Sequence, residues 1–183
     1  MHLFFTEENK IIDKGMSRDL LYKAIVRYSE ISGREIPTEE IIDNLKSTEN
    51  GKPYIEKFPS FSISHTENIW GVIFSEKNCG LDIQVVKNGD FIKIGEKVFS
   101  KNDVEKIKEL GEKAFFRLWA RKEAYIKAFG GTIFEGVPDL FSPEDRLHVN
   151  GYTVFDIELI GETYSAICVE GIVESLKLEK VRL

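Results

Sequence analysis

Residues 113–129 read KAFFRLWARKEAYIKAF and are followed by two glycines. Apolar side chains recur along this stretch within one arc at about 100° per residue, which is the period of a helix. The members of the arc are Phe115, Leu118, Trp119, Ile126 and Phe129. Arg117 and Arg121 fall opposite the arc, where a solvated face is expected. Because glycine commonly ends a helix, the stretch predicts one long amphipathic helix that stops before Gly130 and Gly131.

Three charged side chains of this helix lie at or inside the apolar arc. Glu123 and Lys127 are four residues apart at its edge, so Glu123 is placed to meet another element of the fold. The same spacing also describes an ordinary Glu–Lys pair on a helix surface. Lys122 falls inside the arc, where a lysine must extend its ammonium to the surface or find an anion.

A strand is predicted upstream, around residues 80–84, which read GLDIQ. Successive side chains of a strand alternate between its faces, so Asp82 and Gln84 share one face and Leu81 and Ile83 point to the core. A carboxylate beside an amide oxygen suits a hard cation such as Mg²⁺. An acid that is merely solvated on the wet face of a strand explains the same residues.

Two segments before this strand carry side chains that suit anions. Residues 58–64 alternate as a strand and lead into a loop at His65, which can donate to a phosphate or face water. Residues 50–53 read NGKP, a hairpin signal, and Lys52 within them can bind an anion or simply belong to the turn.

The other segments predict an α+β fold. Strands are expected at residues 2–5, 69–74 and 80–86, and further strands follow from residue 147, at 153–159, 164–169 and 175–181. Helices are expected at 17–32, capped by Ser17, at 38–45, capped by Thr38, and at 90–98 and 101–110. This order suggests two similar halves, 1–76 and 77–183, which meet near residues 75–79. Each half has a long helix and a small, largely antiparallel sheet.

Composition restricts the class of protein. The chain has 183 residues, is 42% hydrophobic and 31% charged, and carries a net charge of -6. The acidic balance argues against a nucleic-acid-binding protein. No apolar run approaches the roughly 20 residues of a membrane span. The start lacks the basic leader of a secretory signal, and two cysteines form no disulfide framework, so a cytoplasmic protein with buried, reduced Cys79 and Cys168 is expected.

Taken together and in order, five segments resemble the Sfp-type 4′-phosphopantetheinyl transferases of the holo-[acyl-carrier-protein] synthase superfamily. They are GKPY, FSISHT, GLDIQ, VFSKND and FFRLWARKEAYIKAFG. The resemblance runs from about Arg18 to Gly131. It implies a pseudo-dimer of two α+β halves with coenzyme A between them. It also implies an Mg²⁺-dependent transfer of the 4′-phosphopantetheine group from coenzyme A to a serine of a carrier protein, which releases adenosine 3′,5′-bisphosphate.

The resemblance also implies roles for individual residues. Asp82 and Glu123, with Gln84 beside them, are expected to hold Mg²⁺ against the pyrophosphate of coenzyme A, and Asp82, Glu123 and Lys127 are the expected catalytic residues. Coenzyme A contacts are expected from Arg18 (at the 3′-phosphate), Lys52, Ser64, His65, Lys122 and Lys127 (at the α-phosphate). Asp103 takes the place of a glutamate that many relatives carry after the turn that reads VFS in this chain, at residues 98–100, and it or Glu123 is a candidate general base.

Three departures from the family pattern leave alternatives open. Gln84 replaces a carboxylate, Asp103 replaces a glutamate, and before the first helix only Lys10 and Lys14 are available for the 3′-phosphate. A homologue of weak or no activity that binds a coenzyme A-like nucleotide or a carrier domain fits the same sequence. So does an unrelated metal-dependent phosphate hydrolase.

The expected protein partner is an apo acyl or peptidyl carrier protein, usually a small acidic helical domain. Residues 113–127 carry five basic side chains and one acidic side chain, a net +4, which can attract such a partner or can be a normal charged helix face. A monomer is expected, with no nucleic acid and no membrane as partner.

Overall fold

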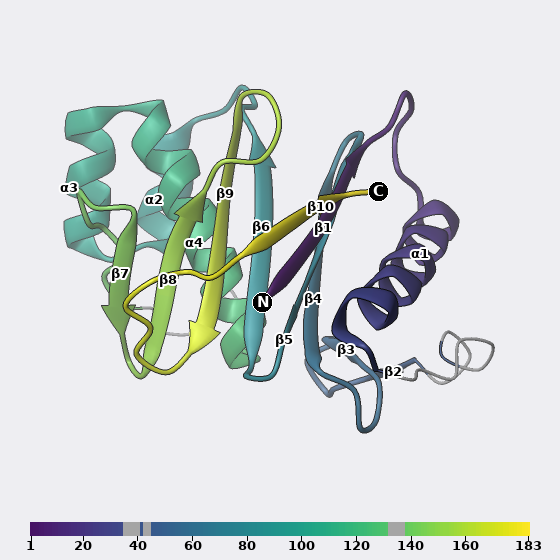
Figure 1. Cartoon of the computed structure of the whole chain (residues 1–183). Helices are drawn as coiled ribbons and strands as arrows, with labels where there is room; N and C mark the ends of the chain where they lie inside the picture. Colours follow the sequence, from purple (N-terminus) through teal and green to yellow (C-terminus); the bar gives the residue numbers. More distant parts are fainter. Residues whose placement is uncertain (35–40, 42–44, 132–137) are drawn as a thin grey trace.

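The computed structural model describes residues 1–34, 41, 45–131 and 138–183. The chain forms two four-stranded sheets, each with a long helix, as a mixed α+β fold (Figure 1). The predicted helix at 38–45 falls mostly on residues outside the described ranges. Within them, none of the helices is both long enough and apolar enough to span a membrane.

The first sheet is covered by one helix, α1. Its strand order is β10-β1-β5-β4, formed by β10 (Glu179–Arg182), β1 (His2–Glu7), β5 (Ile69–Ser75) and β4 (Ser60–Thr66). All pairs are antiparallel except β10 with β1. Helix α1 (Lys14–Ser32) buries only apolar and aromatic side chains against this sheet. A two-stranded hairpin, β2 (Lys46–Ser47) and β3 (Pro53–Tyr54), follows as the NGKP segment predicts.

The long helix predicted at residues 113–129 packs on the second sheet. The strand order of this sheet is β6-β9-β8-β7, formed by β6 (Cys79–Val85), β9 (Thr163–Glu170), β8 (Tyr152–Ile157) and β7 (Arg146–Val149). Helix α4 (Glu112–Phe129) packs on it, and α2 (Phe91–Val98) and α3 (Lys101–Leu110) extend from the same side. Gly130 ends α4 in the left-handed conformation, as predicted.

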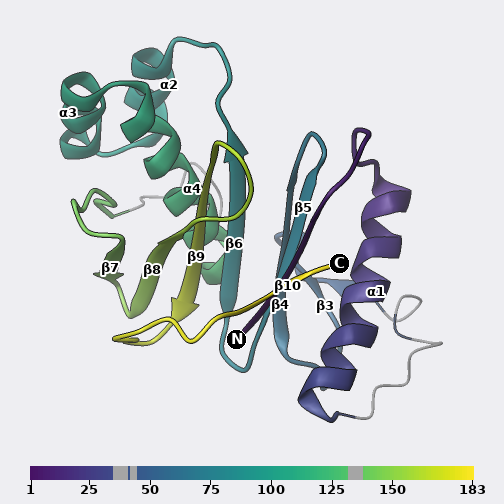
Figure 2. The same cartoon turned by 45° about the horizontal axis from the view of Figure 1, so that its top comes forward.

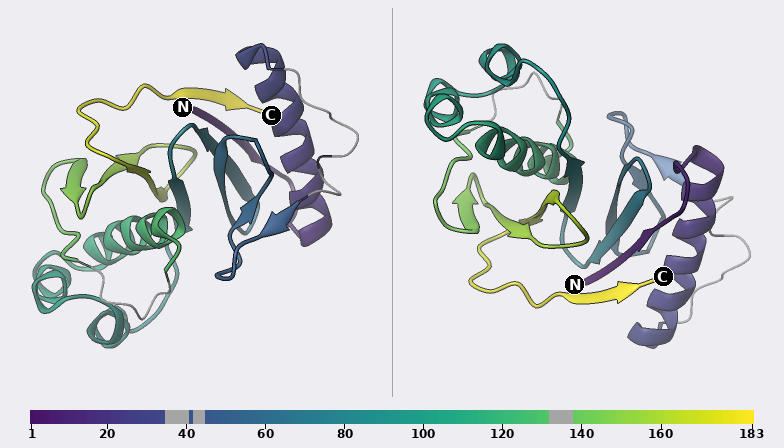
Figure 3. Two further views of the ribbon diagram at one scale, coloured as in Figure 1. Left: turned by 90° about the horizontal axis from the view of Figure 1, so that it is seen from below. Right: turned by 90° about the horizontal axis from the view of Figure 1, so that it is seen from above.

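The two sheets face each other in the middle of the molecule. Their apolar inner faces share one core cluster, to which β1 and β5 contribute from one sheet and β6, β8 and β9 from the other. Helices α1 and α4 therefore lie on opposite outer sides (Figure 3). Leu81 and Ile83 lie in this shared cluster, which confirms the predicted alternation along β6.

Three details differ from the sequence predictions. Asp13, not Ser17, caps α1, by accepting from the backbone N–H of Met16 at 2.8 Å, and Ser17 instead accepts from the indole of Trp70. Phe129, predicted inside the apolar arc, is 55% exposed because α4 ends there. The last strand, β10, leaves the second half and pairs with β1 of the first sheet, as Figure 1 shows.

Candidate functional site

The free edge of β6 is where the two halves meet around polar groups. β6 pairs with β9 on one side only, so alternate backbone groups on its other side need partners from elsewhere. The hydroxyl of Ser62 accepts from the N–H of Leu81, and that of Ser64 accepts from the N–H of Ile83, both at 3.1 Å. Two serines of β4 thus take the place of a neighbouring strand.

The carbonyls along the same edge are satisfied by lysines. Lys52, the residue before β3, donates to the carbonyl of Cys79 at 2.9 Å, and Lys127, from the last turn of α4, donates to that of Leu81 at 3.0 Å. Burial lowers the pKa of Lys52. The segment before β3, strand β4 and the distant end of α4 therefore bring two ammonium groups and two hydroxyls to one strand edge.

Asp82 lies at the centre of this arrangement. Its side chain faces α4 and the residue is only 3% exposed. Oδ1 accepts from Lys127 Nζ at 2.7 Å and from Ser64 Oγ at 3.1 Å, and Oδ2 accepts from the amide nitrogen of Gln84 at 2.6 Å. The buried carboxylate is thus held on both oxygens, as buried charge requires.

Glu123 stands one helical turn before Lys127 on α4 and is half-buried. Burial raises its pKa, and the nearby negative charge of Asp82 raises it further, while Lys127 and Lys122 act in the opposite direction. The strand acid and the helix acid therefore lie close enough for their charges to interact. A raised pKa also makes the Glu123 carboxylate a better proton acceptor near neutral pH.

A pocket of about 260 Å³ opens beside this group. It lies between the β2–β3 hairpin, strand β4 and the end of α4, and its lining includes Lys52, Ser62 and Lys127. Asn50, at the tip of the hairpin, donates to the carbonyl of Gly130 and so ties the hairpin to the end of α4. Sequence reasoning missed Asn50 and Ser62, because only the meeting of β4, β6 and α4 gives them a partner.

The donors around Asp82 suit a hard cation. Asp82, Glu123 and Gln84 offer oxygen ligands, and Mg²⁺ typically takes one or two carboxylates and completes its shell with water and substrate phosphates. The negative charge of Asp82 raises the pKa of Glu123, and a divalent cation relieves this kind of repulsion between carboxylates. Among the described residues, no cluster of three or more His, Cys, Asp or Glu side chains forms a self-sufficient metal cage.

Comparison with known proteins decides the family. The family model of the 4′-phosphopantetheinyl transferase superfamily matches residues 78–169, just over half of the chain. The chain belongs to this superfamily. The matched range contains Asp82, Gln84, Glu123 and Lys127 but not Lys52 or Ser64.

Curated relatives carry the same family name. The 4′-phosphopantetheinyl transferase gsp of Aneurinibacillus migulanus is 29% identical over 167 residues, which cover 85% of this chain and 69% of the relative. The transferase psf-1 of Bacillus pumilus is 33% identical over 127 residues, 66% of this chain and 53% of the relative. The transferase Sfp of Bacillus subtilis is 29% identical over 147 residues, 76% and 62% of the two chains. This phosphopantetheinyl transferase homologue thus spans between about half and two thirds of their length.

Two of the side chains predicted to contact coenzyme A lie away from the Asp82 group. His65 follows Ser64 on β4, so it points to the opposite face of the strand and is exposed. Arg18 is exposed on the first turns of α1, on the outer side of the first sheet. The two residues lie in one region, because Trp70 pairs with His65 across the sheet and contacts Ser17 beside Arg18.

Lys122 also points elsewhere. It is 1% exposed, donates to the carbonyl of Val98 and lies over the ring of Phe99, 5.4 Å from its centroid. Its ammonium therefore joins α4 to the end of α2. Burial lowers its pKa.

Asp103 has a structural environment. Its carboxylate is buried and accepts from the backbone N–H groups of Leu140 and Phe141, so it anchors the segment after residue 138 on α3. Burial raises its pKa, and these hydrogen bonds oppose the shift.

The prediction that Arg117 and Arg121 form a solvated face is wrong. Arg121 is 1% exposed and holds Asp156 with two nitrogens, at 2.7 and 2.8 Å. Arg117 binds the same carboxylate at 2.5 Å. Strand β8 supplies Asp156, a partner that helical periodicity cannot reveal. Much of the positive charge of α4 is thus paired inside the molecule and is not presented to an acidic partner.

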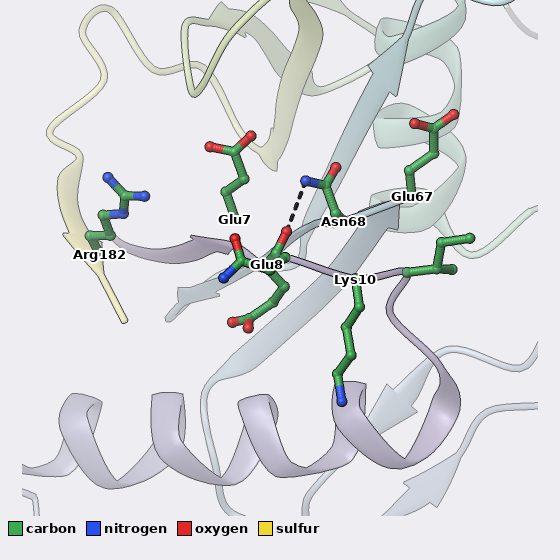
Figure 4. Close-up of a pocket in the computed structure, with 8 residues that line it drawn as sticks. Glu7, Glu8, Lys10, Glu67, Asn68 and Arg182 are labelled. Atoms are coloured by element: carbon green, nitrogen blue, oxygen red, sulfur yellow. Dashed lines mark hydrogen bonds between the residues drawn. The ribbon is translucent and has the colours of Figure 1, made fainter.

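A larger pocket, of about 540 Å³, lies at the other end of the first sheet (Figure 4). Its charged side chains do not converge: Glu7 and Glu67 point to one side and Lys10 to the other, toward α1. The dashed contact is a structural one, from Asn68 to the carbonyl of Glu8 at 2.9 Å. We therefore place the candidate site at the smaller pocket beside Asp82.

Proposed function

We propose that this protein transfers the 4′-phosphopantetheine group of coenzyme A to a serine of an acyl or peptidyl carrier protein and releases adenosine 3′,5′-bisphosphate. Family membership supports the reaction class. The observation that carries the proposal for this chain is the Lys127–Asp82 contact at the border of the pocket, with Glu123 beside it.

Basic and hydroxyl side chains are proposed to bind the diphosphate, and acidic and amide side chains the cation. Lys52 and Lys127 line the pocket and supply positive charge to phosphate oxygens, and Ser64 can add a hydroxyl. Asp82, Glu123 and Gln84 would hold Mg²⁺. When bound, the cation neutralises the charge that develops on the two phosphates. His65 and Arg18 are proposed contacts of the more distant 3′-phosphate. Lys122 is a further proposed contact of the phosphates, but its burial against the carbonyl of Val98 does not support this role.

Glu123 is the proposed general base. In the transfer, the carrier serine Oγ forms a bond to the phosphorus that bears pantetheine, and the bond from that phosphorus to the oxygen of the adenosine phosphate breaks. The serine proton passes to the Glu123 carboxylate. The position of Glu123 on α4, beside Asp82 and one turn before Lys127, supports this role.

We also infer that the two halves form a pseudo-dimer. Each contains a strand, a long helix and two further strands, in the sheet order first, third, second. The first half uses β1, α1, β4 and β5, and the second uses β6, α4, β8 and β9. A monomer in the cytoplasm is the proposed state, and the free thiols of Cys79 and Cys168 fit a reducing compartment.

The direct test uses apo carrier proteins from fatty-acid, polyketide and peptide synthesis. Each is mixed with the protein, coenzyme A and Mg²⁺, and the carrier is weighed by mass spectrometry. A gain of one phosphopantetheine group on the serine is expected, and it should be absent from the Asp82→Asn variant. Coenzyme A binding without any gain would favour a nucleotide- or carrier-binding homologue, and phosphate release without a carrier would favour a hydrolase.

A further inference from the structure

The ammonium of Lys127 donates to the Asp82 carboxylate, which is also the carboxylate proposed to bind the metal. This ammonium contacts Asp82 Oδ1 at 2.7 Å, the carbonyl of Leu81 at 3.0 Å and the hydroxyl of Ser64 at 3.3 Å. An ammonium has three protons, and here each has an oxygen within reach. The Asp82–Lys127 pair is largely buried, with side-chain exposures of 4% and 29%.

Gln84 closes the other side of Asp82. Its amide nitrogen donates to Oδ2 at 2.6 Å. A carboxylate acceptor requires that the NH₂ group face it, so this orientation follows from chemistry. A glutamate at this position would repel Asp82. The glutamine of this chain therefore favours the closed arrangement, in which both Asp82 oxygens are bound by side chains of the protein.

A divalent cation and an ammonium compete for one carboxylate oxygen, because like charges repel strongly in a partly buried site. Metal binding at Oδ1 of Asp82, the oxygen that Lys127 occupies, thus requires that Lys127 move to another anion. Lys127 also lines the pocket proposed for the nucleotide, so a diphosphate entering there offers that anion.

We propose that Lys127 holds the cation position at Asp82 until a diphosphate draws it away, so that the divalent cation and the diphosphate donor bind as a coupled pair. The inference rests on the proposed function, since it takes coenzyme A as the diphosphate. It assigns to Lys127 a positioning role on the metal side of the site in addition to its phosphate contact.

Binding of Mn²⁺, followed by its electron paramagnetic resonance signal, tests the coupling without turnover. In the unaltered protein, coenzyme A should tighten Mn²⁺ binding by about tenfold or more, and Mn²⁺ should tighten coenzyme A binding by the same factor, since such coupling is reciprocal. A titration of coenzyme A with Mn²⁺ in the absence of protein supplies the correction for free chelation. Equal Mn²⁺ affinity with and without coenzyme A would overturn the proposal.

The Lys127→Met variant separates displacement from simple chelation by bound phosphates. With Asp82 released, Mn²⁺ alone should bind about tenfold more tightly than to the unaltered protein, within the usual range of coupling between sites. Lys52→Met is the matched control: it removes one ammonium from the same pocket but leaves Asp82 paired with Lys127, so Mn²⁺ affinity should stay unchanged.

An unchanged or weaker Mn²⁺ affinity in folded Lys127→Met would contradict the displacement. Thermal unfolding verifies folding, and the reciprocal measurements on the unaltered protein stand independently of the variant. Failure here, with the carrier still gaining phosphopantetheine, would remove only this inference. Failure of the carrier to gain mass would remove the proposed function instead.

Discussion

The two halves use similar layers of helix and sheet, but their helices bury different chemistry. Helix α1 buries Leu20, Leu21, Ala24, Ile25 and Tyr28, all apolar or aromatic. Helix α4 buries Arg121 and Lys122 among its apolar residues, with Glu123 and Lys127 at the edge of the buried face. The two helices lie on opposite outer sides of the facing sheets (Figure 2). The apolar face of α1 packs against its own sheet and offers no charged group for a specific contact. Buried charges need partners, and those partners join α4 to β6, β8 and α2.

Replacing a buried charge of α4 by an apolar side chain makes α4 more like α1. Arg121→Met should lower the free energy of unfolding by about 3–5 kcal/mol, since it removes the buried partner of the half-buried Asp156 carboxylate and leaves that carboxylate with Arg117 alone. Urea unfolding measures the loss. Arg27→Met on α1, where the arginine forms an exposed pair with Glu30, should cost at most about 1 kcal/mol. Equal losses for the two arginines would contradict the distinction.

The second substitution touches function and spares the fold. Glu123→Gln keeps the shape of the side chain and should reduce phosphopantetheine transfer by about 10²–10³-fold, the typical loss for removing one electrostatic group from a catalytic site. Unfolding by urea should be little affected. Glu112→Gln, at the exposed start of the same helix, should keep full transfer. Full activity of Glu123→Gln would remove α4 from the catalytic site.

Two glycines near the contact between the halves differ in how closely other atoms approach them. A Cβ at Gly80 of β6 would lie 1.9 Å from the backbone oxygen of Ala124, whereas one at Gly71 of β5 would meet mainly flexible methyl groups at 3.0 and 3.3 Å. Gly80→Ala should therefore cost about 1–3 kcal/mol and reduce transfer, because α4 must move away from Asp82. Gly71→Ala should cost less. A thermally unaltered Gly80→Ala would show that α4 is not fixed against β6.

Gln84→Glu tests the metal side with a smaller expected effect. A second carboxylate beside Asp82 should lower the Mg²⁺ concentration for half-maximal transfer by about tenfold, because ligand charge tunes the affinity of oxygen sites. Asn88→Asp adds the same charge just after β6 and should leave the Mg²⁺ concentration for half-maximal transfer unchanged. If both variants shift it equally, general electrostatics explains the effect and Gln84 is no ligand.

The smallest effect concerns pH and Asp103. Its pKa in the folded state is raised above the ordinary 3.8, mainly by burial, so the folded state binds more protons than the unfolded state in that range. Its contribution to stability is therefore largest below the ordinary pKa and falls as pH rises through the raised value. Stability relative to Asp103→Asn should decline as pH rises above the ordinary pKa of 3.8. A rising difference would mean that the hydrogen bonds from Leu140 and Phe141 outweigh burial.

Local sequence patterns predicted much of the fold. Alternation in FSISH and GLDIQ identified β4 and β6, with Leu81 and Ile83 in the core, and the 3.6-residue period identified α4 to within one residue of its start. These signals are local, because strand and helix geometry fix which neighbours share a face. The same reasoning wrongly predicted that Arg121 faces solvent, because helical periodicity cannot show that β8 places Asp156 beside it.

Most helices and strands, the family pattern and the residue types that can bind a diphosphate and a cation are evident in the amino-acid sequence. Which of these residues meet depends on the packing of the folded chain. β6 has a free edge, so Ser62, Ser64, Lys52 and Lys127 satisfy its backbone groups and gather around Asp82. Lys122 lies five residues before Lys127, on a different side of α4, and donates to the carbonyl of Val98 instead. Buried polar groups must find partners, and which partners lie within reach depends on how distant segments pack.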